Sequence, residues 1–343
     1  LAVTAVGLAL AQPALNLLQL GGEARGLALA YLVPVLLGAP LFLANAVMNA
    51  RLAAQGDTRT YRNALVAGAL ANIALNPVFM FALDLGVAGI AWATVLIQAA
   101  TLAYLGHRAG RDGLADVPAA GFDRATAAAL LRQSLPPMGN MALIGVSLFI
   151  ITAFVGRHGE AALAAYSVGL RIEQLFLLPT VGLGAAALTL VGNAFGAGRY
   201  ARILEISKVA IGYALVVMAA GTGLILLARE PLMLAFSRDP AVVEAGVRYL
   251  TVAALIQCAY AFTMIGNALL QGIGQPLWSF AVAVLRSLIG PLAVLSVVEL
   301  VLDLGLDAIF WSILAINWTA AVVMVLVVRR RLARDCGLAA GVD

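Results

Sequence analysis

Charged residues are scarce in this chain, at 11% of its 343 residues, whereas 63% of the residues are hydrophobic. Soluble domains carry about 25% charged residues, so this composition excludes an ordinary soluble protein. Apolar stretches long enough to cross a bilayer follow one another along the whole chain. The sequence therefore predicts an all-α protein that crosses the membrane many times.

Cysteine and histidine are almost absent, with two residues of each. Cys258 and Cys336 show neither zinc nor redox spacing, and His107 and His158 lie in separate polar connections. Walker A, HExxH and G-x-S-x-G motifs are missing as well. We therefore predict no enzyme activity, no metal and no cofactor, and we expect an ion gradient to supply any energy that the protein uses.

Ten apolar segments have the length of a membrane-spanning helix. They lie at about residues 3–20, 27–54, 61–83, 87–106, 134–156, 161–194, 200–227, 241–270, 276–301 and 307–328. The polar connection at 107–125 is the one long break in hydrophobicity. We therefore expect an N-lobe at 1–110, an inter-lobe connection at 111–125, a C-lobe at 126–330 and a tail at 331–343.

Basic residues gather on one side of the predicted array. That side includes Arg51, Arg59, Arg62, Arg108 and the tail arginines 329, 330, 331 and 334. The positive-inside rule makes it the cytoplasmic side. We expect an inner-membrane protein whose C-terminus faces the cytoplasm, and we attribute the net charge of +4 to topology rather than to nucleic-acid binding.

An internal repeat relates the two lobes. Three residues recur at one constant spacing, namely Pro13, Tyr31 and Asn49 as Pro231, Tyr249 and Asn267. With short insertions, Gln55-Gly56 matches Gln271-Gly272, 83–86 matches 302–305, and Trp92 matches Trp311. An even number of helices separates equivalent positions, which indicates parallel repeats. The spacing also predicts two further helices upstream of residue 1, and so twelve in all with six per lobe.

Two charges fall inside the apolar segment 161–194, at Arg171 and Glu173. Charges at membrane depth are costly, so they commonly face a bundle interior or a wet cavity. The two residues are about 200° apart around a helix, which prevents them from pairing with each other. Arg286, or a bound ion or substrate, is the expected partner of Glu173. A structural ion pair and a role in a substrate cavity both remain open for these three residues.

The same segment contains Pro179, Gly182 and Gly184, which we assign to a helix bend, to close packing or to a hinge. On paper the glycines fit the dinucleotide pattern G-x-G-x-x-A. They follow no predicted strand and lie inside a membrane span, so nucleotide binding is not favoured.

Asn72 and Asn76 stand four residues apart on one face of the segment 61–83, with Tyr31 and Thr94 on neighbouring segments. Buried amides and hydroxyls need partners, and such a cluster can coordinate a cation. Hydrogen bonding between helices is the alternative explanation.

Several motifs resemble the multidrug and toxic compound extrusion (MATE) transporters: Leu-Arg-Gln-Ser-Leu-Pro at 131–136, the stretch 166–198, Asn-Ile-Ala-Leu-Asn-Pro at 72–77, and Leu-Gln-Gly-Ile-Gly-Gln-Pro at 270–276. The resemblance implies two six-helix bundles around a V-shaped cavity. It also implies a membrane-embedded monomer that exports organic cations and drugs in exchange for H⁺ or Na⁺. By position, the family's cation or proton site corresponds to Tyr31, Asn72, Asn76 and Thr94, with an aspartate expected upstream of residue 1.

The chain departs from the family in two places. Asn76 stands where aspartate is common, and the acids that another branch carries on its seventh and tenth helices are missing from 136–154 and 245–270. We therefore expect ion coupling in the first lobe, and we expect this chain to be inactive without the upstream aspartate.

A lipid-linked saccharide flippase is the alternative transporter, although it should have a strongly cationic cavity. An intramembrane enzyme or a scaffold is the alternative outside transport.

Overall fold

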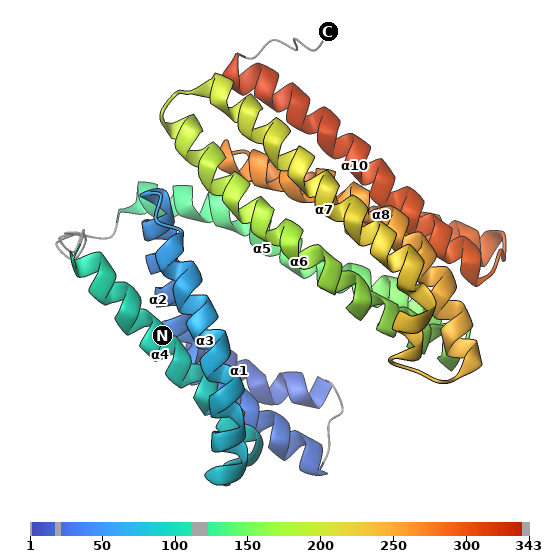
Figure 1. The fold of residues 1–343 in the computed structure, drawn as a ribbon, viewed down its shortest axis with the longest axis horizontal. Helices are drawn as coiled ribbons and strands as arrows, with labels where there is room; N and C mark the ends of the chain where they lie inside the picture. The colour runs from blue at the N-terminus through green and yellow to red at the C-terminus, as the bar shows by residue number, and fades with distance from the viewer. Residues whose placement is uncertain (1, 18–21, 112–122, 338–343) are drawn as a thin grey trace. The chain divides into compact units, whose positions relative to one another are not determined.

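A computed structural model describes residues 2–17, 22–111 and 123–337 of the chain (Figure 1). Within these ranges the secondary structure is entirely helical, which confirms the all-α prediction. The α-helices are α1 (Ala2–Leu17), α2 (Gly22–Ala54), α3 (Arg59–Pro77), α4 (Gly86–Arg111), α5 (Arg124–Gly156), α6 (Glu160–Gly196), α7 (Tyr200–Leu234), α8 (Pro240–Gly272), α9 (Pro276–Val284) and α10 (Leu306–Cys336).

Two of the helices change to π-helical geometry before they end. Helix α3 continues as η1 (Val78–Ala82), and α9 continues as η2 (Leu285–Ile289), η3 (Pro291–Leu295) and η4 (Val297–Val301). Counted with these extensions, nine spans in the described ranges are long and apolar enough to cross a membrane. Helix α1 occupies the remaining predicted segment, whose last residues lie outside the described part of the chain.

Several helices extend beyond the limits that hydrophobicity predicts, and α5 and α10 do so by the most residues. Helix α5 begins at Arg124 rather than near residue 134, because the Asp123 carboxylate accepts the backbone amides of Ala125 at 3.1 Å and Thr126 at 3.0 Å. Helix α10 runs through the basic stretch to Cys336, so much of the expected tail is helical. Polar and charged residues can continue a helix past the apolar core of the span.

The chain divides into two compact units, residues 1–121 and 122–343, with the division inside the polar connection 107–125. In the first unit, α2 and α3 both pack on α4 and have little contact with each other. In the second unit, α8 is the central helix and packs on α6, α7 and α10. Accordingly, α8 is the most buried of the nine spans: 67% of the residues in its most apolar stretch are buried.

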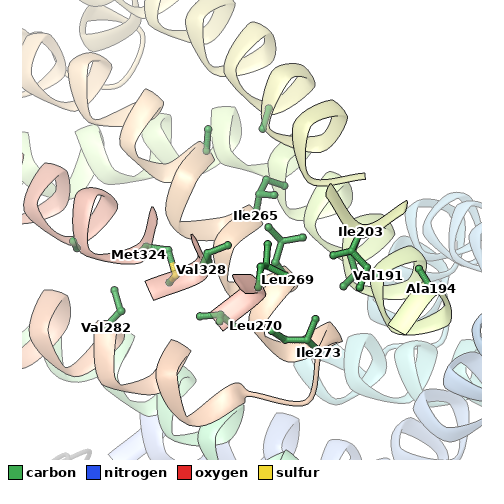
Figure 2. Close-up of a cluster of buried hydrophobic side chains, with 14 of the residues drawn as sticks. Val191, Ala194, Ile203, Ile265, Leu269, Leu270, Ile273, Val282, Met324 and Val328 are labelled. Atoms are coloured by element: carbon green, nitrogen blue, oxygen red, sulfur yellow. The ribbon is translucent and has the colours of Figure 1, made fainter. Parts of the chain in front are cut away.

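The largest buried cluster of the second unit lies where α8 meets α6, α7, α9 and α10 (Figure 2). Its labelled members include Val191, Ile203, Ile265, Leu269, Leu270, Val282, Met324 and Val328. Lipid tails are as apolar as these side chains, so close packing rather than exclusion of water holds such helices together. The members of the cluster come from five helices, so their packing joins these helices into one bundle.

The backbone supports the internal repeat. Asp84 and Asp303 have positive φ angles of 51° and 47°, and they are the non-glycine residues in the described ranges that do so. Each follows a π-helical turn, η1 in the first unit and η4 in the second. Aspartate is one of the few residue types that tolerates this conformation. The two units therefore share an uncommon backbone conformation at equivalent positions, which supports common ancestry independently of the matching residues.

One detail of the predicted repeat is wrong. Gly56 and Gly274 both have positive φ angles, 88° and 73°, whereas Gly272 lies inside α8. Gly56 therefore corresponds to Gly274, at the same spacing that relates Tyr31 to Tyr249. The repeat has no insertion at this turn.

The spacing lengthens by one residue between Gly274 and Asp303. This part of the second unit contains η2 and η3, whereas the corresponding part of α3 is α-helical. A π turn holds one more residue than an α turn, and π turns are common at functional sites. The extra residue thus falls in the stretch that contains the π-helical turn of Arg286.

Asp57 caps the start of α3. Its Oδ1 accepts the backbone amides of Thr60 and Arg59, both at 3.0 Å, and its Oδ2 accepts the Thr60 hydroxyl at 2.5 Å. These bonds, led by the one from the Thr60 side chain, lower the pKa of Asp57 below its usual 3.8. We expect Asp57→Ala to lower the free energy of unfolding by about 1 kcal/mol at neutral pH.

The effect of this substitution should depend on pH. Because the pKa is lowered in the folded state, the stabilisation is complete above the usual value and is lost as the pH falls through the lowered one. Thermal unfolding in detergent should therefore show the gap between wild type and Asp57→Ala closing on acidification, with exposed Glu205→Ala as the control. A gap that persists at low pH would contradict this assignment.

Candidate functional site

Helix α6 presents Arg171 and Glu173 to different surroundings. Glu173 is buried, with 3% of its surface exposed, whereas Arg171 is exposed. This difference follows from the two-residue offset, which turns the side chains to nearly opposite faces of the helix. Only Glu173 therefore belongs to the interior of the second unit.

The partners of Glu173 are tyrosines rather than the expected arginine. The Tyr249 hydroxyl on α8 donates to Glu173 Oε2 at 2.6 Å, and the Tyr260 hydroxyl also hydrogen-bonds to this carboxylate. Within the described ranges Arg248 forms an ion pair with Asp307 and His158 hydrogen-bonds to Glu299, whereas the predicted direct pair of Glu173 with Arg286 is not formed. The reason is packing, because α8 lies directly against α6.

Aromatic contacts hold the tyrosines in place. The rings of Tyr166 and Tyr249 meet edge to face, with centroids 5.1 Å apart, and Tyr249 meets Phe310 at 5.2 Å in the same way. The Arg286 guanidinium carbon lies 5.8 Å from the ring centre of Tyr260. Such edge-to-face and cation–π contacts are favourable and directional. They restrict where the Tyr249 hydroxyl can point.

This network lines a cavity of about 220 Å³, which we call the tyrosine cavity. Its walls include Tyr166, Glu173, Gln174, Tyr249, Tyr260, Arg286, Ser287 and Asn317. A buried carboxylate that already accepts tyrosine hydroxyls is well stabilised as a structural element. The same groups also have the chemistry to hold a cation or a proton.

A second cavity of about 410 Å³ adjoins it and shares Ile144, Met264 and Arg286 with its lining. We call it the methionine cavity, after Met141, Met264 and Met324 in its walls. Thr180, Gly184 and Asn267 also line it. The sequence could not predict either cavity, because the lining residues come from helices far apart in the chain.

Gly182 and Gly184 on α6 do not make the close helix contacts that the sequence predicts. A Cβ atom added at Gly182 would meet nothing within 4 Å, and one at Gly184 would meet only the Met264 carbonyl oxygen at 3.9 Å. Helices α6 and α8 approach closely at Gly169 instead, where an added Cβ would overlap the ring of Tyr249, and at Gly272, where it would overlap Val191. Pro179 lies inside α6, which remains helical on both sides of it. Gly169 lies one helical turn before Glu173, on the same face of α6. This spacing could have identified Gly169 from the sequence as a residue that faces the interior.

In the first unit the structure joins part of the predicted cluster. Asn76 Nδ2 donates to Asn72 Oδ1, and Asn76 Oδ1 is buried without a partner among the described residues. The Thr94 hydroxyl donates to the Ile90 carbonyl of its own helix at 3.0 Å. Tyr31 is 42% exposed on α2, which has little contact with α3. The two asparagines thus pair, while Thr94 and Tyr31 have no recorded contact with them.

A polar pair that sequence reasoning missed joins α2 to α4. Asn45 Nδ2 donates to the carbonyl oxygen of Gln98 at 2.9 Å and to its Oε1 at 2.7 Å. Along the repeat these positions correspond to Thr263 and Asn317, which line the methionine and tyrosine cavities respectively. The repeat spacing was the available signal, since polar side chains recur at both positions.

Within the described ranges, no three His, Cys, Asp or Glu side chains gather closely enough to hold a metal ion. The chemistry that the lining of the two cavities offers is that of hydroxyls, amides, one carboxylate and one guanidinium.

Comparison with known proteins identifies similar chains. The family model described as MatE matches residues 136–295. The "Probable multidrug resistance protein NorM" of Chromobacterium violaceum is 28% identical over 246 residues, which cover 69% of this chain and 53% of the relative. The "Multidrug export protein MepA" of Staphylococcus saprophyticus is 26% identical over 330 residues, covering 93% of this chain and 71% of the relative.

Solved structures agree with these matches. An outward-facing multidrug resistance MATE family transporter superposes with a TM-score of 0.91 at 25% identity, covering 97% of this chain and 76% of that one. The chain spans about half the length of the NorM relatives that it matches, at 53% and 57%.

Proposed function

Because the chain belongs to the multidrug and toxic compound extrusion (MATE) family, we propose that it works as a secondary active efflux transporter, exporting organic cations and drugs in exchange for H⁺ or Na⁺. The observation that carries the proposal is the MatE match at residues 136–295, which includes Glu173 and most of the residues that line the two cavities. Polar groups and cavities inside apolar spans are typical of transport paths. We place the protein in the inner membrane as a monomer with a cytoplasmic C-terminus.

For the coupling ion we propose a site in the first unit, at Tyr31, Asn72, Asn76 and Thr94. Its support is the buried Asn76 Oδ1, which has no partner among the described residues and could ligate a cation. Amide and hydroxyl oxygens coordinate hard cations such as Na⁺. All four side chains offer such oxygens, so by themselves they favour Na⁺.

For Glu173 we propose a structural role. Two tyrosine hydroxyls already bond its carboxylate, which gives it a reason to be buried without any ion. A lipid-linked saccharide flippase is less well supported, because Arg286 is the single basic residue in the lining of the two cavities. A pyrophosphate group calls for several such charges.

The test of the coupling site is transport by the full-length protein. Reconstituted in liposomes, it should extrude ethidium when an inward Na⁺ or H⁺ gradient is imposed. We expect Asn72→Ala to weaken the ion dependence by about tenfold or more, since a lost bond to a charged group costs roughly 1.5–3 kcal/mol. It should also abolish growth protection from lipophilic cations in cells.

Leu70→Ala is the matched control, because Leu70 is a 64% exposed apolar residue on the same helix. Unchanged coupling in Asn72→Ala would remove this site from the mechanism. Loss of efflux under both gradients in the wild type would refute antiport itself.

A further inference from the structure

The methionine cavity contains a single charge, and that charge is positive. Arg286 is the one ionisable group among its lining residues, and none of them is acidic. With a volume of about 410 Å³, the cavity is within the range of sites that bind small molecules. All of its described walls belong to the second unit, from α5, α6, α8, α10 and the span 276–301.

Arg286 has no hydrogen-bond acceptor among the described residues. Its recorded contact is the cation–π approach to Tyr260. The Glu173 carboxylate attracts it electrostatically, but Glu173 is bonded to tyrosines and does not line this cavity. A guanidinium carries five donors and is costly at membrane depth without a partner. The cavity thus offers charged donors with no protein acceptor.

Two further donors line the same cavity. The Thr180 hydroxyl is fully buried and has no partner in the described structure. Asn267 Oδ1 already accepts Gln271 Nε2 at 2.8 Å and the Ser279 hydroxyl, which leaves the Asn267 Nδ2 amide without a recorded acceptor. Asn267 and Arg286 are half-buried, whereas the Thr180 hydroxyl is a fully buried polar group of the kind that is rarely left unpaired. A ligand that supplies acceptor oxygens would satisfy all three groups.

The lining also contains the polar residues Asn140, Thr263, Gln271 and Ser279, and the remainder is apolar and adaptable. Met141, Met264 and Met324 contribute flexible thioethers, and Ile144 and Leu188 add aliphatic surface. Methionine suits sites that accept ligands of varied shape. The lining therefore fits a molecule with an apolar body and a compact group rich in acceptors.

We propose that the methionine cavity binds an amphipathic anion, whose carboxylate, sulfonate or phosphate group lies at Arg286 and whose apolar body packs against the methionines. The inference rests on the proposed transport function where the anion is a cargo molecule, and it extends the cargo beyond organic cations. The same chemistry is present in a dissolved solute and in the headgroup of an anionic lipid.

The test compares two probes that share one fluorophore. Dansylglycine carries a carboxylate and dansylcadaverine an ammonium group, and the binding of each is measured by fluorescence with the protein in phosphatidylcholine nanodiscs. We expect the wild type to bind dansylglycine at least about tenfold more tightly than dansylcadaverine. Arg286→Gln should weaken dansylglycine binding by about tenfold, in line with loss of a charge-assisted bond. Arg286→Lys should keep most of the affinity.

Arg202→Gln is the matched control, because Arg202 is an exposed arginine of the same unit that lines neither cavity. Thr180→Val covers the case in which Arg286→Gln fails to fold. It removes the unpartnered hydroxyl at nearly constant volume, so stability should hold or rise while dansylglycine binding weakens. Equal affinity for the two probes, or dansylglycine binding that neither variant weakens, would overturn the proposal.

The source of the anion can be distinguished in the same assay. Competition by phosphatidylglycerol in the nanodisc would identify a lipid headgroup, whereas undiminished binding would identify a dissolved solute, and both results support an anion site. The measurement uses no ion gradient. Failure of anion binding with intact ethidium antiport would therefore reject this inference alone. Anion binding without ethidium antiport would reject the proposed function alone.

Discussion

Replacing Gly169 with alanine is expected to lower the free energy of unfolding of the second unit by about 1–3 kcal/mol, the usual effect of overpacking. An added Cβ would overlap the ring of Tyr249, which is only 2% exposed. That ring cannot move aside freely, because it packs edge to face on Tyr166 and Phe310 and its hydroxyl is bonded to Glu173. Thermal unfolding of the purified protein in detergent measures the effect.

Gly182→Ala is the matched control on the same helix. An added Cβ there meets nothing within 4 Å, and alanine is a better helix former than glycine by about 1 kcal/mol. This variant should therefore be neutral or stabilised. If Gly169→Ala proved as stable as Gly182→Ala, the tight contact between α6 and α8 would be refuted.

Tyr249→Phe is expected to destabilise the protein by about 1–3 kcal/mol, because it leaves the Glu173 carboxylate buried with one donor fewer. The ring remains, so packing on Tyr166 and Phe310 is preserved and the loss reports on the hydroxyl. Glu173→Gln should also reduce stability while transport of ethidium is retained. That combination is what a structural carboxylate predicts.

The double variant separates a shared interaction from two independent ones. If Glu173 and Tyr249 act through their mutual hydrogen bond, the two losses should not add in Tyr249→Phe/Glu173→Gln. Tyr213→Phe, at a 63% exposed tyrosine, is the control for removal of a hydroxyl. Full additivity, or loss of transport in Glu173→Gln with stability unchanged, would favour a direct role for Glu173 in transport.

Some features of the site were accessible before any coordinates. The different surroundings of Arg171 and Glu173 follow from a two-residue offset on a helix, and the shared face of Asn72 and Asn76 follows from a four-residue offset. These are properties of one helix. Local geometry alone determines them, so the sequence predicts them reliably.

The partner of Glu173 was not accessible in this way. An arginine was the natural electrostatic choice, yet Tyr249 and Tyr260 provide the bonds. Both tyrosines are on α8, far along the chain, and charge complementarity carries no information about which helix lies against α6. The correct partner depends on how α6 and α8 are rotated about their axes and on the missing side chain at Gly169.

The amino-acid sequence by itself determined that the protein is an all-helical membrane protein, where its spans lie, and that its two halves repeat, because the transfer of apolar segments into lipid is a local property. It also carried the motifs that resemble the MATE family. Only the tertiary structure decided which polar groups meet, where the two cavities lie, and that Arg286 faces a cavity without an acid in its lining. Those outcomes depend on the packing of helices distant in the chain, where small residues and ring contacts, rather than hydrophobicity, select the arrangement.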